Sequence, residues 1–489
     1  MEKPLEHQLS GLTNILDNNA EHDSMPPANN NSNYPQLSPS SIQECIGAKK
    51  KVWIEAYGCS ASMADSEMIT GLLKNGGYEI ATDEAEASLN LIVTCSVKDA
   101  TEQKMLYKID KFSKSGKPLV VAGCLPKADR KRVESITPSA SLVGANSIDK
   151  AVDVVNSTIS GQKMVVLEDS LSDKINLPRI RLNPAISIVE IASGCMSECS
   201  FCQTKLVKGW IKSYSIGNIM RQIQNDVQEG CREIWLSSTD NGCYGKDIGS
   251  NLVQLLESCC TIDGDYKIRV GMMNPMYLPS MIERLVKLFA YNNKIFKFLH
   301  IPVQSGSDRI LRKMKRGHSV KIFHDAVKIF RSKIPEITIA TDVIAGFPSE
   351  TEEDFQQTLT LIKETQPDIV NISGYSARPG TTSVKLKKVS SNIVKDRTKK
   401  LHLLTREIAR RRNSLWKGWR GEIIVDEIKD NIPQGRNYAY KPVLVLSPSS
   451  QPISSILLKP TYTGFSIGNK IIVQIDNYSD RTLRGTSIN

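Results

Sequence analysis

Short apolar runs alternate with amphipathic stretches along most of this chain. Strand-like runs separated by helical spacing are typical of a parallel α/β sheet. We therefore expect residues 49–160 to form a Rossmann-like parallel α/β domain, followed by a linker at residues 161–184. The apolar runs of this first part cover residues 51–57, 89–95, 118–124 and 140–145.

The strand-then-helix pattern continues in a second part and repeats about six times between residues 185 and 380. A basic amphipathic helix is expected next, at residues 393–413, with Leu401, Leu404 and Ile408 on one face. We assign residues 185–415 to this second domain. Its candidate strands are residues 187–193, 233–239, 266–273, 295–303, 337–347 and 368–376.

The two ends of the chain have residue patterns that differ from the alternating pattern between them. After Trp419, short β-rich runs predict a small barrel, and we assign residues 416–480 to this third domain. Residues 1–48 are rich in Asn, Pro and Ser and lack apolar periodicity, which predicts a disordered tail.

Composition indicates the cellular compartment in which the protein works. No stretch approaches the ~18 consecutive apolar residues of a membrane span, and the first residues lack the apolar core of a secretory signal. We therefore expect a cytoplasmic protein with no membrane partner. In that setting the 11 cysteines indicate reduced thiols and metal ligation more than disulfides.

Positive charge is concentrated in one segment. Residues 385–420 hold thirteen lysines and arginines but only two acids, Asp396 and Glu407. This excess equals the net charge of the whole chain, +11. Such a stripe is either a solvated helix face or the electrostatic footprint of a nucleic-acid binder. As candidate RNA contacts within it we select the cations Lys399, Lys400, Arg410, Arg411 and Arg412.

The most specific motif is a run of three cysteines, Cys195, Cys199 and Cys202, spaced CxxxCxxC directly after the first strand of the second domain. Three thiolates on one loop can hold three irons of a 4Fe–4S cube and leave the fourth iron open. A structural zinc site is the alternative, but it needs four protein ligands. The nearest further cysteines, Cys231 and Cys124, are distant in sequence, which favours the iron–sulfur cluster.

A second set of cysteines closes three predicted strands of the first domain: Cys59, Cys95 and Cys124. In a parallel sheet the carboxyl ends of the strands share one edge, where ligands gather. These thiols either converge on one site or are ordinary buried cysteines. Cys243, in a loop after the second strand of the second domain, could line an active site, but we do not expect it to be a ligand.

Beyond the cysteines, several runs of the chain resemble the methylthiotransferase family of radical S-adenosylmethionine (SAM) enzymes. The resemblance covers residues 50–476, and its most specific runs are Gly58-Cys59, Thr94-Cys95-Ser96-Val97-Lys98, Gly123-Cys124, residues 300–307 (HIPVQSGS), residues 342–351 (DVIAGFPSET) and residues 376–381 (SARPGT). It implies an incomplete TIM-like (βα)6 radical SAM barrel for the second domain and an RNA-binding TRAM domain for the third.

The resemblance also implies the chemistry. The cysteine run would hold the cluster that cleaves SAM to a 5′-deoxyadenosyl radical, and Cys59, Cys95 and Cys124 would hold a second 4Fe–4S cluster that delivers methylated sulfur. The cofactors would be two 4Fe–4S clusters and SAM, and the partners tRNA, a ferredoxin- or flavodoxin-like electron donor and a sulfur source. Polar residues at strand ends are candidates for holding SAM or substrate: Asn274, Gln304, Ser305 and Arg378.

The substrate follows from two further runs, residues 271–275 (GMMNP) and 435–443 (GRNYAYKPV), which look like the archaeal and eukaryotic branch of the family. That branch adds a methylthio group to C2 of N6-threonylcarbamoyladenosine at position 37 of tRNA. Isopentenyladenosine in tRNA, a ribosomal-protein aspartate and a different radical SAM reaction remain alternatives. So does an RNA-binding protein with a structural metal site and no activity.

Overall fold

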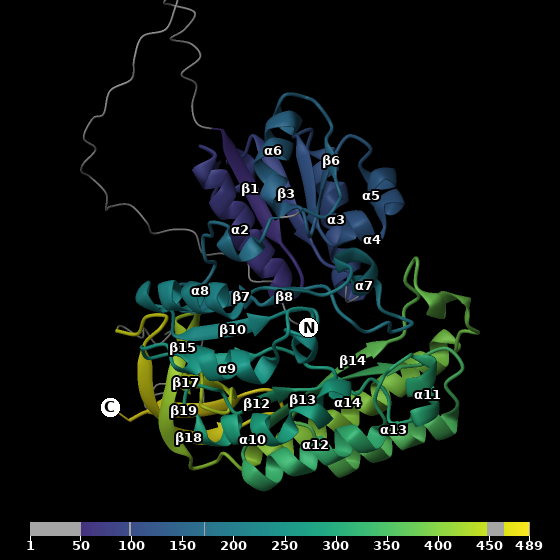
Figure 1. Cartoon of the computed structure of the whole chain (residues 1–489), viewed down its shortest axis with the longest axis vertical. Coiled ribbons are helices and arrows are strands. Elements are labelled where there is room, and N and C mark those ends of the chain that lie inside the picture. Colours follow the sequence, from purple (N-terminus) through teal and green to yellow (C-terminus); the bar gives the residue numbers. More distant parts are fainter. Residues whose placement is uncertain (1–49, 97–98, 171, 447–463, 489) are drawn as a thin grey trace, which may run out of the picture.

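The computed structural model describes residues 50–96, 99–170, 172–446 and 464–488. The predicted N-terminal tail lies outside these residues. Figure 1 shows an N-terminal α/β domain above a larger α/β domain, with a small all-β domain at one side of the latter. This arrangement confirms the predicted fold class.

The N-terminal domain is a six-stranded parallel sheet in the order β2-β1-β3-β4-β5-β6. One apolar cluster packs α2 and α6 on one face, and a second packs α3 and α5 on the other. Because both faces are covered, the central strands β3, β4 and β5 are apolar and fully buried. The elements are β1 (Lys51–Ala56), α2 (Ser60–Asn75), β2 (Glu79–Ile80), β3 (Leu89–Thr94), α3 (Asp99–Lys114), β4 (Leu119–Gly123), α4 (Leu125–Ala128), α5 (Arg130–Ile136), β5 (Ser141–Gly144), α6 (Ala151–Ile159) and β6 (Val165–Val166).

The second domain contains all six predicted strands, and each pairs in parallel with its neighbours. They form two three-stranded sheets, β11-β10-β7 and β12-β13-β14, which are joined by a bridge between Ile268 and Ile295. The result is an open (βα)6 half-barrel. Its strands are β7 (Ile186–Glu190), β10 (Glu233–Ser237), β11 (Lys267–Val270), β12 (Phe298–His300), β13 (Thr338–Ala345) and β14 (Ile369–Gly374), with a short antiparallel pair β8 (Ala192–Ser193) and β9 (Lys212–Ser213) above β7.

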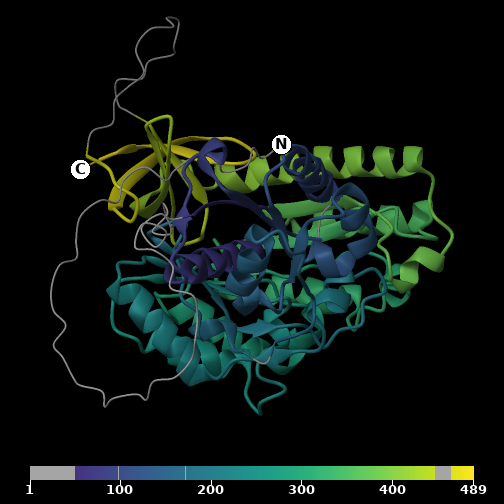
Figure 2. The ribbon, with the colours of Figure 1, turned by 90° about the horizontal axis from the view of Figure 1, so that it is seen from above.

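Helices cover the outside of the half-barrel and enclose its apolar core. Helix α14 carries the predicted basic amphipathic face, with Leu401 and Ile408 buried against the barrel. Figure 2 shows α14 running along one side of the barrel to the small β domain. The helices are α7 (Gln203–Lys208), α8 (Ile216–Gln228), α9 (Leu252–Cys260), α10 (Ile282–Tyr291), α11 (Asp308–Lys313), α12 (Val320–Lys333), α13 (Glu352–Thr365) and α14 (Ser391–Ser414).

The third domain is a closed barrel in the order β15-β16-β17-β19-β18. It extends beyond residue 480, where we expected it to end, because β19 pairs with both β17 and β18 and so closes the barrel. The side chain of Asn413, at the end of α14, donates to the Ser479 carbonyl (2.9 Å) and ties the two domains. The strands are β15 (Arg420–Lys429), β16 (Ile432–Arg436), β17 (Pro442–Leu446), β18 (Lys470–Tyr478) and β19 (Leu483–Ser487).

Candidate metal centres

The three cysteines of the CxxxCxxC motif lie on one loop, residues 194–202, at the carboxyl end of β7; we call it the cysteine loop. Gly194 opens the loop with φ +75, and a Cβ at this position would lie 2.1 Å from the Trp210 carbonyl oxygen. Only glycine therefore allows the loop to turn so close to the return strand. The Cys195 amide then donates to the Gly209 carbonyl (3.3 Å), which fixes the base of the loop.

Nitrogen donors surround the sulfurs of the loop. The Ser197 amide donates to Cys195 Sγ (3.3 Å), and Arg316 donates through Nη1 to Cys199 Sγ (3.5 Å). A hydrogen bond from Cys243 lowers the pKa of Cys195 to about 6. Burial, followed by the charge of Cys199, raises the pKa of Cys202 to about 11. Three cysteines on one loop, with hydrogen-bond donors to two of their sulfurs, are the donor set that an iron–sulfur cluster needs.

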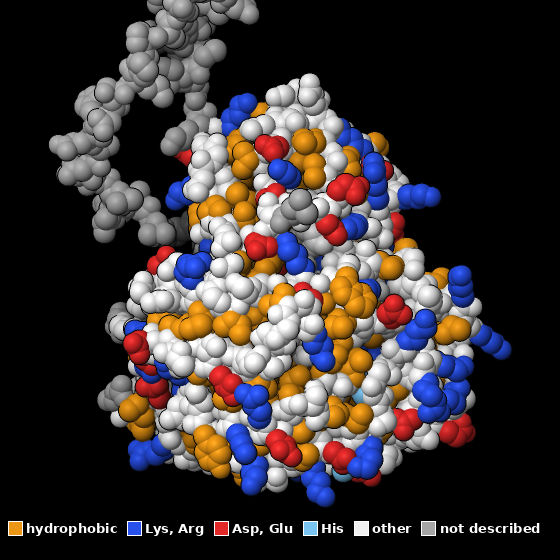
Figure 3. Space-filling model, in the orientation of Figure 1, with side chains coloured by type: hydrophobic (Ala, Val, Ile, Leu, Met, Phe, Trp, Pro, Cys, Tyr) orange, Lys and Arg blue, Asp and Glu red, His pale blue; other side chains and the backbone are white. Residues whose placement is uncertain are grey.

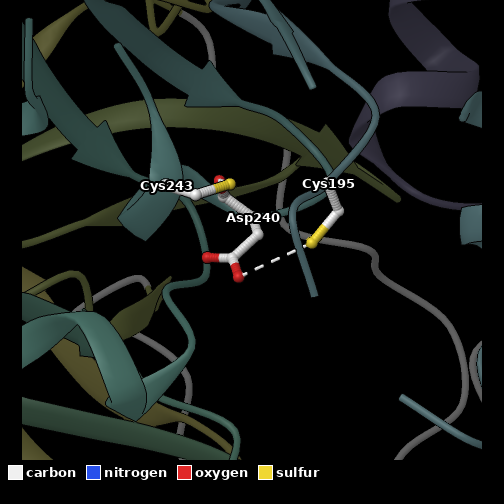
Figure 4. Close-up of side chains that lie close together, drawn as sticks. All are labelled: Cys195, Asp240 and Cys243. Carbon is white, nitrogen blue, oxygen red and sulfur yellow. Dashed lines mark hydrogen bonds between the residues drawn. The ribbon is translucent and has the colours of Figure 1, made fainter. Parts of the chain in front are cut away.

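Two residues from the end of β10 complete the buried side of this site. The Sγ of Cys195, the carboxylate of Asp240 and the Sγ of Cys243 lie within 4.8 Å of one another, and all three residues are buried (Figure 4). Asp240 accepts hydrogen bonds from the amides of Gly242 and Asn274 (both 3.0 Å). Burial, then the nearby Cys195, raises the pKa of Asp240 to about 7. Asp240 was not among the residues that the sequence analysis selected.

The dispersed cysteines, Cys59, Cys95 and Cys124, stand at the carboxyl ends of β1, β3 and β4. The strand order reverses between β1 and β3, and ligands of open α/β sheets bind at such a reversal. Gly58 has φ +124, and a Cβ there would lie 2.3 Å from the Cβ of Cys95. This close approach of two strand ends brings Cys59 and Cys95 together; that they share a cluster site with Cys124 stays a prediction.

The protonation of the dispersed cysteines also indicates one shared site. A hydrogen bond from Cys95 lowers the pKa of Cys59 to about 5. Burial and, to a smaller extent, the charge of Cys59 raise the pKa of Cys124 to about 12. Cys124 packs in an apolar cluster with Val207 of α7, the helix that follows the cysteine loop. Cys124 thus lies against the barrel domain, and three thiols of this kind are the ligand number of a cluster with one open iron.

Four buried charges join the two domains between these cysteine sets. Lys174 of the linker pairs with Asp65 of α2 (2.6 Å) and Glu190 of β7 (3.1 Å), and Lys208 of α7 pairs with Glu190 (3.0 Å). Burial raises the pKa of Glu190, but Lys174 and Lys208 lower it, and the net pKa is about 2. Burial lowers the pKa of Lys208, but Glu190 and Asp65 raise it, and the net pKa is well above its usual value. Two cations and two anions balance, so the interface stays charged and paired.

The four candidate SAM contacts have different surroundings. Asn274 lies at the site, since its Nδ2 donates to Ser197 Oγ of the cysteine loop (3.3 Å). Gln304 has φ +72, and its backbone forms hydrogen bonds with the backbone of Asp342 and Ile344 in β13. These bonds use only main-chain groups, so the Gln304 side chain stays a candidate for contact with SAM.

The other two have structural partners, so their predicted role in holding SAM is not supported. Ser305 is fully buried, and its hydroxyl accepts from the Ser307 amide (3.2 Å). Arg378 is buried and forms an ion pair with Glu102 of the N-terminal domain. Both residues were selected because they are polar and lie at a strand end. This criterion does not distinguish a residue that contacts a ligand from one that bonds to another part of the protein.

The candidate RNA contacts lie on α14. Lys399, Lys400, Arg410 and Arg411 are exposed, as a phosphate-binding face requires. Arg412 does not fit this role, because it is partly buried and donates through Nε to the buried Asp368 (3.1 Å). Among the helices of the described residues, none has the length and apolar composition to cross a bilayer.

Comparisons with known proteins identify both cysteine-bearing domains. Residues 189–362 match the family model described as the Radical SAM superfamily, and residues 51–144 match one described as "Uncharacterized protein family UPF0004". Among solved structures, the radical SAM methyltransferase TsrM from Kitasatospora setae has a TM-score of 0.50 at 12% identity, covering 69% of this chain and 75% of that one. This similarity supports the fold alone.

Curated relatives extend the match over most of the chain. A Pyrococcus abyssi protein named "Probable threonylcarbamoyladenosine tRNA methylthiotransferase" is 39% identical, over 77% of this chain and 88% of its own length. A Drosophila pseudoobscura threonylcarbamoyladenosine tRNA methylthiotransferase is 37% identical, over 75% and 67%. The human protein of that name is 38% identical, over 72% and 62%. The chain belongs to the family of threonylcarbamoyladenosine tRNA methylthiotransferases, within the radical SAM superfamily.

Proposed function

We propose that this protein adds a methylthio group to C2 of N6-threonylcarbamoyladenosine at position 37 of tRNA. SAM would serve as the source of the radical and of the methyl group. We assign one 4Fe–4S cluster to Cys195, Cys199 and Cys202 and a second to Cys59, Cys95 and Cys124. The relatives named above carry this activity in their names, and the alignments with them cover 72–77% of this chain.

One structural observation carries the proposal: a residue next to each cysteine set contacts the other domain across the interface. Ser60, next to Cys59, hydrogen-bonds to Ser237 at the carboxyl end of β10 (3.0 Å). Gln203, next to Cys202, donates to the Ala128 carbonyl of the N-terminal domain (3.1 Å). The strand ends of both sheets therefore meet at one boundary, where Figure 1 shows α7 and β8. A reaction that joins a sulfur species to a carbon radical needs two such neighbouring sites.

The target C–H bond explains why the site carries thiols in place of an acid–base pair. This hydrogen is not acidic and the carbon has no leaving group, so proton transfer alone cannot substitute it. When bound, the two clusters and SAM supply the radical and the methylated sulfur. The chain's own residues position the reacting groups and shield them from solvent. Asp240 fixes the amide of Asn274 beside the cysteine loop, and Arg316 holds Cys199.

Two partners and a location complete the proposal. An iron–sulfur site that cleaves SAM reductively requires a low-potential electron donor, which we propose is ferredoxin- or flavodoxin-like. Each methylthio group consumes one sulfur atom, so a sulfur source must also act. We further propose that these partners and tRNA meet the protein in the cytoplasm.

Mass spectrometry of nucleosides tests the activity directly. Reconstituted protein, SAM, a reductant and sulfide are incubated with tRNA that carries either N6-threonylcarbamoyladenosine or isopentenyladenosine at position 37. We expect the 2-methylthio product from the first tRNA alone. Product from isopentenyladenosine alone, or methylthiolation of a ribosomal-protein aspartate and of neither tRNA, would reassign the substrate. The Cys195→Ala, Cys199→Ala, Cys202→Ala variant is the control for cluster-independent sulfur transfer.

A further inference from the structure

Two surface segments border the cysteine loop at the carboxyl ends of the barrel strands. The turn after α11 meets the loop where the Ser200 amide donates to the Met314 carbonyl (2.9 Å). The segment after β14 meets it where the Ser383 amide donates to the Ser200 carbonyl (2.9 Å). Both segments therefore form the rim of the barrel mouth, the end at which barrels of this kind place their chemistry.

These two segments carry a cluster of exposed cations, which we call the rim patch. Figure 3 shows Lys and Arg side chains gathering over this edge, where Figure 1 draws α11 and the loop after β14. Within the part of the chain that the structure describes, no member of the patch forms an ion pair. The rim patch consists of Arg312, Lys313, Lys315, Lys385, Lys387 and Lys388.

Some cations of helix α14 have acidic partners, unlike those of the rim patch. On that helix Lys400 pairs with Asp396, Arg406 with Asp480 and Arg412 with Asp368. A paired cation must break its ion pair before it binds a phosphate, whereas an unpaired one only releases counterions. All cations of the rim patch can therefore bind phosphate without breaking an ion pair, whereas on α14 only some of them can, among them Lys399, Arg410 and Arg411.

An exposed aromatic residue lies beside the same mouth. Trp210 is 58% exposed, and its backbone contacts the start of the cysteine loop at Gly194. The ammonium of Lys205 lies 4.1 Å from the centre of its ring and donates to the Cys195 carbonyl, so the indole is held next to the loop. The exposed indole offers a flat apolar face that a partner can cover. Unpaired nucleobases cover such rings by stacking.

We propose that the rim patch and Trp210 form the binding surface for the single-stranded loop of the RNA substrate, with the cations on phosphates and the indole stacked on a base. The inference rests on the proposed function for the identity of the RNA. A second partner class, an acidic electron-transfer protein, would also fit unpaired cations near a cluster. The exposed indole favours RNA, because nucleobases stack on it and an acidic protein surface gains nothing specific from it.

A matched pair of charge variants tests the rim patch. The rim variant carries Lys313→Gln, Lys385→Gln, Lys387→Gln and Lys388→Gln. The control variant removes four exposed cations from the outer helices, with Lys287→Gln, Lys328→Gln, Lys333→Gln and Lys363→Gln. Both lose the same charge. Full-length reconstituted proteins are compared by fluorescence anisotropy with an anticodon stem-loop at several salt concentrations, after melting temperature and iron content have confirmed folding.

We expect the rim variant to bind at least about tenfold more weakly and to lose roughly three units of the slope of log affinity against log salt, since each phosphate contact contributes about 0.7–0.9. The control should stay within about twofold of wild type, because non-specific charge effects are small once the contacts are kept. Equal slopes and affinities for the rim variant and wild type would overturn the inference. A rim variant that keeps RNA affinity but is reduced more slowly by an acidic flavodoxin would also overturn it.

Substitution of Trp210 tests the stacking part. Trp210→Ala should weaken stem-loop binding about tenfold with an unchanged salt slope, and Trp210→Phe should retain most of the affinity. Wild-type affinity in Trp210→Ala would remove the indole from the surface. If wild-type protein binds the stem-loop but yields no methylthio nucleoside, the proposed function fails, while these binding results still decide the inference.

Discussion

The cysteine loop and the dispersed cysteines reach similar three-thiol sites by opposite routes. The loop places Cys195, Cys199 and Cys202 within one turn of chain and needs only Gly194 and a short strand pair to shape it. The dispersed cysteines are 36 and 29 residues apart in sequence, and the sheet brings them together at a reversal of strand order. A local motif can thus be recognised by its spacing alone, whereas a topological one needs predicted strand ends and a family resemblance as well.

The two regions also differ in how they are held. Main-chain amides and Arg316 support the cysteine loop, so its thiolates depend on local donors. The dispersed cysteines depend on the packing of two domains, through the apolar contact of Cys124 with Val207 and the buried charges at Lys208 and Glu190. We therefore expect the loop to keep its function when the domain interface is weakened, and the dispersed set to lose it.

The largest effect should come from the loop itself. Replacing Cys195, Cys199 and Cys202 together by Ala removes every thiol of that loop, so 5′-deoxyadenosine formation should fall to background. Liquid chromatography of anaerobic reactions with dithionite measures it. Turnover within tenfold of wild type would show that this loop is not where SAM is cleaved.

Replacing Cys59, Cys95 and Cys124 by Ala should separate the two regions. The methylthio nucleoside should disappear, because its sulfur comes from the second site, while 5′-deoxyadenosine formation should stay within a few-fold of wild type. Both products are measured in one reaction. Normal methylthio product from this variant would mean that the dispersed cysteines are structural, the plain reading that their positions in the sequence left open.

The sequence predicted the regular framework well. The basic helix follows from its periodicity, and the barrel strands and the central strands of the N-terminal sheet follow from short apolar runs, because a strand covered on both faces is apolar throughout. Short strands such as β8 and β9 carry too few residues for a pattern, and β19 begins after a predicted boundary. The end of the small barrel was therefore placed too early.

The functional residues also differ in whether the sequence could predict them. The six cysteines were found by spacing, strand position and resemblance. Asp240 and Lys208 were not, because their roles arise from partners that lie 34 and 18 residues away in sequence, Asn274 and Glu190. Arg412 shows the reverse error, since a basic helix face gives no sign that the buried Asp368 binds one of its arginines. Tertiary pairing of charges is what sequence patterns do not encode.

A smaller effect should follow from breaking the buried charges at the interface. Lys208→Met leaves Glu190 with Lys174 alone and should lower the free energy of unfolding by about 3–5 kcal/mol, the usual cost of an uncompensated buried charge. It should also reduce methylthio product more than 5′-deoxyadenosine. Urea unfolding and the product assay measure both, with the exposed Lys287→Met as the control. Equal losses of the two products would remove Lys208 from any specific link to the dispersed set.

The smallest effect is expected at Cys243. Its Sγ lies within 4.8 Å of Cys195 and Asp240, yet the cysteine loop already supplies three thiolates. Cys243→Ser should therefore leave the iron content unchanged and alter SAM cleavage by less than about threefold. A loss of roughly four irons in this variant would make Cys243 a ligand and reduce the role of the loop.

The central claim is that each region holds its own cluster, and counting iron and acid-labile sulfide tests it most directly. Anaerobically reconstituted wild-type protein should contain about eight irons and eight sulfides per chain, from two cubes of four. Each triple Ala variant should retain about four of each. Four irons in wild type, or eight in either triple variant, would contradict the account.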